Sequence, residues 1–222
     1  MKPKFRLALT ALLVGSANAA VLVNPTGLTN TSGVSEFFPA INIINNTGLS
    51  GAADIANYTT ITHGTAGAGS AWTTNDPNGA GDYFLATSPG TAAVFTLALD
   101  QLYGLTDFVY WGYHFGNPNG NEGREYTLSF STDGGATFPT STTVSNPLST
   151  YAVGNATTLS LGGTFTANTV RLDITDNHFG GTSPGGDRIG LGEAKFIGDA
   201  VPEPSTGLLG GLALLALLRR RR

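Results

Sequence analysis

The sequence predicts an all-β domain, an antiparallel sandwich or jelly roll, followed by a short apolar helix at the C-terminus. Two observations lead to this fold class. The 222-residue chain has 31 glycines and no cysteine, and its apolar residues occur in short runs separated by Gly, Asn, Asp and Pro. Glycine disfavours long helices, and short β-rich segments between turn residues are typical of sandwiches. Without disulfides, the hydrophobic core must hold such a domain together.

The expected strands follow one another between residues 83 and 197. They are residues 83–85, 93–99, 106–115, 125–131, 142–144, 157–161, 170–175 and 190–197. Residues 108–113 are apolar on both faces, which predicts a central strand covered on both sides. Residues 125–138 predict the clearest hairpin, because Tyr126, Leu128 and Phe130 alternate with polar residues and Asp-Gly tolerates positive φ in the turn.

The first 19 residues have the pattern of a secretory signal peptide. A basic leader precedes the apolar run 7–14, and Ala17 and Ala19 form an Ala-x-Ala cleavage pattern. The apolar run is too short to serve as a stable membrane anchor. We therefore expect cleavage after Ala19 and a mature β domain spanning residues 20–200.

The C-terminal residues combine three features in order. Val201, Pro202, Glu203 and Pro204 are followed by the uncharged residues 207–218 and then by four arginines. The two prolines predict an extended, accessible motif. Twelve residues would form a helix of about 18 Å, shorter than the ~30 Å hydrocarbon core, and the arginines would stay on the cytoplasmic side. These features predict a temporary membrane anchor.

This tail resembles the PEP-CTERM sorting signal of exported bacterial proteins. The resemblance implies that an exosortase recognises the Pro-Glu-Pro motif and releases or transfers the protein. It also implies a transient inner-membrane anchor in a Gram-negative-type bacterium, and a final place at the cell surface or in an exopolysaccharide-rich matrix. An ordinary short C-terminal anchor is the alternative.

Removal of both predicted signals changes the charge of the chain. Seven of its 11 Lys and Arg residues lie in the two signals, which leaves four cations against 14 of the 15 acidic residues, a net charge of 4 − 14 = −10. A nucleic-acid-binding domain needs the opposite sign, so nucleic acid is excluded as a partner. An acidic surface suits solubility and Ca²⁺, which prefers oxygen ligands.

The order of several stretches in the domain looks like that of the galactose-binding-like jelly roll, the factor 5/8 type C or discoidin-like group. The stretches are residues 97–100, 108–111, 126–135, 170–174 and 189–196. The resemblance implies a structural Ca²⁺ near the last strand, with Glu193 as a ligand and Asp54 or Asp76 as a partner. Alternatively, Glu193 is an ordinary strand carboxylate.

Two loops, residues 113–124 and 176–188, mix aromatic rings with hydrogen-bonding side chains. Sugar recognition needs both, and the resembled group binds ligands in such loops at one end of the sandwich. The candidate glycan-binding residues are Tyr113, His114, Asn117, Asn119, Asn121, Glu122, Arg124, His178 and Arg188. Alternatively, Trp111 and Tyr113 belong to the core, and the Asn and Gly residues only form turns.

Catalytic motifs do not appear in the sequence. It has no His-Glu-x-x-His, Gly-x-Ser-x-Gly, Walker or dinucleotide-binding motif, and its three histidines lack metal-ligand spacing. Residues 131–138 fit an Asp-box, but one copy predicts a structural hairpin only. We therefore expect a non-catalytic, exported carbohydrate-binding protein. The alternatives are a surface or matrix protein without a ligand and a small glycan hydrolase that uses two carboxylates.

Overall fold

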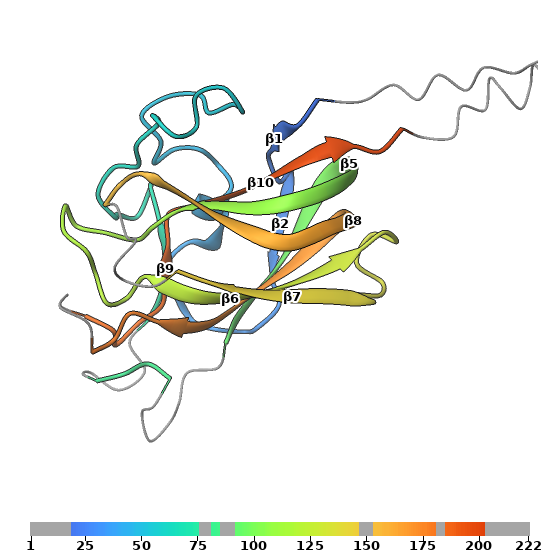
Figure 1. Ribbon diagram of the computed structural model, residues 1–222. Coiled ribbons are helices and arrows are strands. Elements are labelled where there is room, and N and C mark those ends of the chain that lie inside the picture. The colour runs from blue at the N-terminus through green and yellow to red at the C-terminus, as the bar shows by residue number, and fades with distance from the viewer. Residues whose placement is uncertain (1–18, 76–80, 85–91, 147–152, 181–184, 203–222) are drawn as a thin grey trace, which may run out of the picture.

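The structure is a computed structural model that describes residues 19–75, 81–84, 92–146, 153–180 and 185–202. It confirms the predicted all-β antiparallel sandwich, built from a seven-stranded and a three-stranded sheet (Figure 1). Ala17, Asp76, Glu203, Pro204 and the predicted apolar helix lie outside the described residues, so signal cleavage and anchoring stay predictions. Across the described part of the chain, no helix has the length and apolar character needed to cross a membrane.

The larger sheet contains most of the chain. Its strands, in spatial order, are β1 (Val21–Val23), β10 (Glu193–Ala200), β5 (Ala93–Trp111), β8 (Ala156–Asn177), β6 (Gly123–Ser131) and β7 (Thr140–Ser145), with β2 (Gly27–Asn30) also paired to β5. The smaller sheet consists of β3 (Glu36–Phe38), β4 (Trp72–Thr74) and β9 (Gly190–Leu191), and the 3₁₀ helix η1 (Ala40–Ile43) follows β3. The two sheets meet where the Trp72 and Phe95 rings pack edge to face, 4.7 Å apart.

β5 and β8 are much longer than expected, at 19 and 22 residues. The sequence predicts two separate strands in each region, because turn-forming residues interrupt the apolar pattern. In the structure these interruptions are absorbed within continuous strands, and the β5–β8 register shifts between Ala98 and Tyr103 and between Leu105 and Asp107. A bulge lets a strand continue past residues that would otherwise form a turn.

The middle of the larger sheet is covered on both faces, as the sequence predicts. β5 lies between β10 and β8. Phe108 and Tyr110 pack into the main core, while Val109 and Trp111 pack on the opposite face with Leu22. The alternating side chains of β6 also point into the main core.

The predicted hairpin is present between β6 and β7. Phe130 pairs with Thr140, so β7 begins just after the predicted hairpin limit at residue 138 and includes the expected strand 142–144. Gly134 and Gly135 have φ values of 72° and 89°, the left-handed conformation that glycine adopts without strain. The Asp133 carboxylate accepts hydrogen bonds from the Ser131 hydroxyl (2.6 Å) and from the backbone N–H and hydroxyl of Thr137 (2.9 and 2.7 Å).

Asp133→Ala is expected to lower the melting temperature at neutral pH, because the turn loses these hydrogen bonds. The hydrogen bond from the Ser131 hydroxyl has the largest effect on the Asp133 pKa and those from Thr137 the next largest, and together they lower it to about 2. A carboxylate with a depressed pKa stabilises the fold above its ordinary value of 3.8 and loses this effect as the pH falls towards 2. Thermal melts of both proteins should therefore differ at pH 7 and converge near pH 2. Equal melting temperatures at pH 7 would contradict the role of this turn.

The two ends of β10 mark the two ends of the sandwich. Glu193 pairs with Trp111, whereas Ala200 pairs with Tyr103. The loop that follows Trp111 therefore lies at the start of β10, and the C-terminal tail leaves from the other end. There the Val201 N–H donates to the Leu102 carbonyl (2.9 Å). β1 runs beside β10, so both ends of the domain lie together, away from the loops (Figure 1).

Candidate functional site

Two loops, residues 112–122 and the described residues 178–180 and 185–189, come together at the end of the sandwich opposite the tail. The Asn121 Oδ1 accepts hydrogen bonds from the backbone N–H groups of Gly186 and Arg188. The Asn177 Nδ2 donates to the carbonyls of the same two residues, at 2.8 and 2.9 Å. These side-chain amides thus hold residues 186–188 of the second loop against the first loop and the end of β8.

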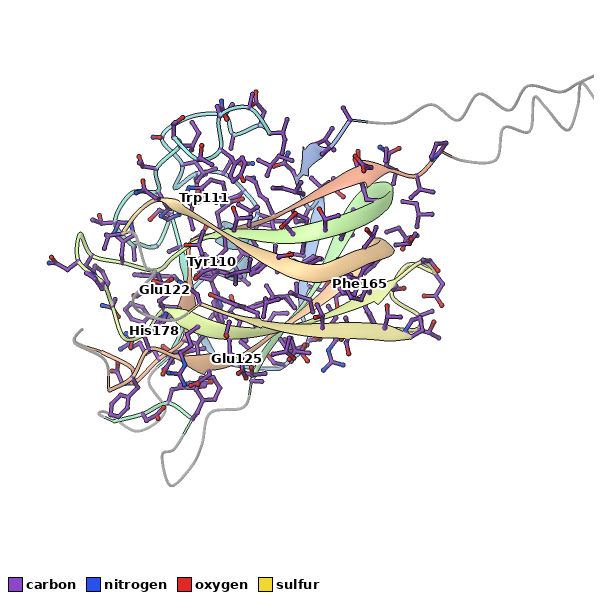
Figure 2. The ribbon with its side chains drawn as sticks, in the orientation of Figure 1. Tyr110, Trp111, Glu122, Glu125, Phe165 and His178 are labelled. Atoms are coloured by element: carbon purple, nitrogen blue, oxygen red, sulfur yellow. The ribbon has the colours of Figure 1, made fainter. Side chains whose placement is uncertain are left out.

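Most of the predicted glycan-binding side chains at this end are buried. They are Tyr113, His114, Asn121, Glu122 and His178. Figure 2 shows Glu122 and His178 at this end of the sandwich and Phe165 towards the other. These side chains have little or no contact with solvent, and the Asn121 amide positions the second loop through its hydrogen bonds. Trp111 and Tyr113 are themselves buried, at 0% and 3% exposed, and Trp111 packs in a hydrophobic cluster with Leu22 and Val109.

Close packing against glycines explains how the loops hold these side chains. A Cβ on Gly190 would lie 2.4 Å from the Tyr113 ring, and a Cβ on Gly112 would lie 2.5 Å from the Glu122 carboxylate. Only glycine leaves room for both groups. The loop conformation therefore depends on a glycine at its own start, Gly112, and on Gly190 in β9.

Burial also determines the charge state of His178. The loss of hydration on burial is the main cause that lowers the His178 pKa, and the nearby positive charge of Arg124 is the second. Together they lower it to about 4. The opposing effect of Asp176 is weaker. At neutral pH the imidazole is therefore uncharged.

The predicted residues that remain accessible are Asn117, Asn119, Arg124 and Arg188. Arg124 is paired with Asp176. Arg188 lies 3.9 Å from the Asp187 carboxylate, and its guanidinium is 4.6 Å from the centre of the Phe37 ring. A cation over an aromatic face is a favourable arrangement that keeps the side chain extended.

Sequence reasoning missed three exposed aromatic residues at this end. Phe37, Phe115 and Phe179 are 55%, 52% and 43% exposed. The Phe115 ring packs edge to face on Tyr113, with 5.3 Å between ring centres. Phe179 packs on Gly186, where an added Cβ would lie 2.4 Å from its side chain. We call Phe37, Phe115, Phe179 and Arg188 the aromatic rim.

A repeated tripeptide is the sequence signal for two of these rings. His-Phe-Gly occurs at residues 114–116 and 178–180, once in each loop. In both copies the histidine is buried, the phenylalanine is exposed and the glycine has a positive φ, 85° at Gly116 and 76° at Gly180. The two loops therefore present a phenylalanine in the same manner, between a buried histidine and a glycine with a positive φ.

Of the predicted calcium ligands, Glu193 and Asp54 are described, and each carboxylate already accepts hydrogen bonds from other protein groups. The Glu193 carboxylate is buried, lies 3.3 Å from the Lys195 Nζ and accepts a hydrogen bond from the Asn46 N–H (3.1 Å). Burial raises the Glu193 pKa to about 7, against the opposing charge of Lys195. The Asp54 carboxylate accepts the backbone N–H groups of Ala56 and Asn57 in a surface turn. Among the described residues, no group of three or more His, Cys, Asp or Glu is placed to hold a metal ion.

Several solved carbohydrate-binding modules are similar to this chain. The structure of GH31 CBM32-2 bound to GalNAc is 12% identical over 82% of this chain and 98% of its own, with a TM-score of 0.47. The family 32 CBM of C. perfringens NanJ, in complex with galactose, is 11% identical over 81% and 99%, with a TM-score of 0.47. CpGH89CBM32-5 from Clostridium perfringens, in complex with GalNAc-β-1,3-galactose, is 20% identical over 77% and 93%, with a TM-score of 0.41. Since these TM-scores are below 0.5, we take the fold from the strand order itself and infer no ligand from them.

No curated protein sequence matches the chain. Residues 200–222 match the model of the PEP-CTERM protein-sorting motif, which implies export and processing by an exosortase. The predicted resemblance of the tail, including Val201, Pro202, Glu203 and Pro204, is confirmed. The chain therefore ends in a PEP-CTERM sorting motif.

Proposed function

We propose that this protein is a non-catalytic carbohydrate-binding module that acts at the surface or in the matrix of a Gram-negative-type bacterium. Its aromatic rim binds a surface or matrix polysaccharide, and an exosortase processes its tail after a transient stay at the inner membrane. One observation carries the proposal: two His-Phe-Gly loop tips present exposed Phe115 and Phe179 rings at the same end of the domain.

The chemistry of the rim suits a sugar. Aromatic faces pack against the C–H groups of a pyranose ring, and nearby polar groups bind its hydroxyls. Asn117 and Arg188 supply such groups beside the rings, and Asp187 is within 3.9 Å of Arg188. The side-chain amides of Asn121 and Asn177 hold the loops through hydrogen bonds before a ligand arrives. This limits the conformational entropy lost on binding.

The placement of the rim also favours recognition away from the membrane. The loops lie at the start of β10 and the sorting tail follows its end. Eight residues of strand separate these points, a distance of roughly 26 Å at about 3.3 Å per residue. A protein held by its tail would thus present the rim outward, towards the polysaccharide around the cell.

The Phe115→Ala, Phe179→Ala double variant is expected to bind polysaccharide at least tenfold more weakly, equivalent to about 1.4 kcal/mol or more. Affinity gel electrophoresis of the purified protein, through gels that each contain one of a panel of neutral and acidic polysaccharides, measures this. Because both rings are exposed, the melting temperature should change little. Val21→Ala removes exposed apolar surface near the tail end and serves as the control.

Two results would refute the proposal. If the wild type is not retarded by any polysaccharide in the panel, a purely structural surface protein is the better interpretation. If the double variant binds as tightly as the wild type, the rim is not the binding site. Release of reducing sugar from a retained polysaccharide would instead indicate a hydrolase.

A further inference from the structure

Lys195 is a cation in the interior of the domain. Its side chain is fully buried in β10, whereas Arg124, Arg171 and Arg188 retain 47%, 44% and 27% of their side-chain exposure. An ammonium group taken out of water is strongly destabilising unless other oxygens replace its hydration shell. Burial accordingly lowers the Lys195 pKa, and the Glu193 carboxylate opposes this effect.

Three side-chain oxygens surround the ammonium. The Lys195 Nζ donates to the Asn24 Oδ1 at 2.6 Å, to the Asn46 Oδ1 at 2.5 Å and to the Glu193 Oε1 at 3.3 Å. An ammonium has three N–H donors, so each oxygen can take one. The set contains one carboxylate and two neutral amides, which balances a single positive charge.

These oxygens belong to segments that are far apart in the sequence. Asn24 follows β1 and is 171 residues from Lys195, and Asn46 follows η1 and is 149 residues from it. Among the described residues, Asn46 is also the non-glycine residue with a positive φ, 62°. Such a conformation persists when the surrounding contacts hold it in place. The ammonium therefore joins the N-terminal segment and the residue 45–50 loop to the last strand.

Solvent can approach this cluster from one side. A hollow of about 400 Å³ is lined by Asn24, Asn46, Leu49 and residues 51–53. Two of the three acceptor oxygens, those of Asn24 and Asn46, thus belong to residues that also line an open space. A small ion entering the hollow would meet the same oxygens that now bind Lys195.

The residues around Glu193 do not fit a calcium ion while Lys195 is in place. Amide and carboxylate oxygens are ligands that Ca²⁺ accepts, but here they bind an ammonium, and a second cation among them would be repelled. We propose that the Lys195 ammonium is a built-in cation that joins three segments in place of a metal ion, and that its removal opens a site for a small cation. The proposal is independent of the glycan-binding function.

Thermal melts of the full chain test this proposal with Lys195→Ala. Without added ions, the variant is expected to melt roughly 10 °C lower than the wild type, because a buried carboxylate loses its partner. Millimolar calcium, or propylammonium, which replaces the deleted end of the side chain, should raise the variant's melting temperature by roughly 5 °C. The wild type should melt at the same temperature in calcium and in a chelator.

Arg171→Ala is the matched control, since Arg171 and Asp173 form an ion pair two residues apart on a strand, as Lys195 and Glu193 do, but in contact with solvent. Neither cation should rescue it. If Lys195→Ala does not fold, Asn46→Gly removes one of the oxygens that accept from the Lys195 Nζ while allowing the positive φ, and it should lower the melting temperature. Three results would overturn the proposal. Calcium could stabilise the wild type as much as it stabilises Lys195→Ala, neither cation could raise the melting temperature of Lys195→Ala, or Asn46→Gly could melt at the same temperature as the wild type.

Discussion

Replacing Phe108 with alanine is expected to lower the free energy of unfolding by about 3–5 kcal/mol, as for other large-to-small changes in a packed core. The Phe108 side chain is fully buried in β5. Its ring centre lies 5.6, 5.2 and 5.7 Å from those of Tyr110, Tyr126 and Phe196. Removal of the ring would leave a cavity between three strands of the larger sheet. Urea denaturation followed by circular dichroism measures the change.

Phe115→Ala is the matched control for this prediction. It deletes the same ring seven residues further along the chain, where the side chain is 52% exposed, so the expected loss is below about 1 kcal/mol. Phe108→Leu keeps the core apolar and should cost less than Phe108→Ala, which provides a second measurement if the alanine variant does not fold. Similar losses at Phe108 and Phe115 would contradict the assignment of one ring to the core and the other to the rim.

The alternation of apolar and polar residues along the sequence predicted much of the hydrophobic core around Phe108. Tyr126, Leu128 and Phe130 alternate with polar residues, and this period of two places them on one face of β6. The length of β5 and β8 was not predictable in the same way. Asp100 in β5 and Gly162 in β8 have the propensity to end a strand, and both lie at register shifts of the β5–β8 pairing, which resumes on the far side of each shift. Strand pairing between distant segments overrides local propensity here.

The sequence predicted which two loops lie together at one end of the sandwich, but not which of their side chains are buried. The loops around His114 and His178 are where aromatic and polar residues meet, and the sequence shows this. Burial of the two histidines depends on the strands beneath them, and exposure of Phe115 and Phe179 follows from it. A search for repeated short motifs, rather than for residues with hydrogen-bonding groups, would have indicated these rings.

The environment of Lys195 was the least predictable feature. Glu193 and Lys195 alternate with Ala194 and Phe196, which is typical of a strand with one face in solvent. In the structure, segments 149 and 171 residues away cover that face and supply amide oxygens. Nothing within the local sequence indicates which segments these are. The expectation of calcium at Glu193 came from the family resemblance alone. It did not take into account that Lys195, two residues along the strand, places its own positive charge beside this carboxylate.

Acidification from pH 6.5 to pH 4 is expected to lower the free energy of unfolding by about 3 kcal/mol through His178. Burial and the charge of Arg124 lower the folded-state pKa to about 4, below the ordinary value of 6.5. Between these values the unfolded chain binds a proton that the folded protein does not bind. The stabilisation is therefore fully present above pH 6.5 and is lost as the pH falls towards 4. Burial also lowers the His63 pKa, which acts in the same direction.

Urea denaturation of the wild type and His178→Asn, from pH 7.5 to pH 4, isolates this contribution. Other groups titrate in both proteins, including Glu193, whose raised pKa of about 7 acts in the opposite direction. Their effects cancel in the difference between the two proteins. That difference should shrink by about 3 kcal/mol as the pH falls from 6.5 to 4. A difference that stays constant over this range would mean that the His178 pKa is close to its ordinary value in the folded protein. The burial of this histidine in the structure would then be wrong.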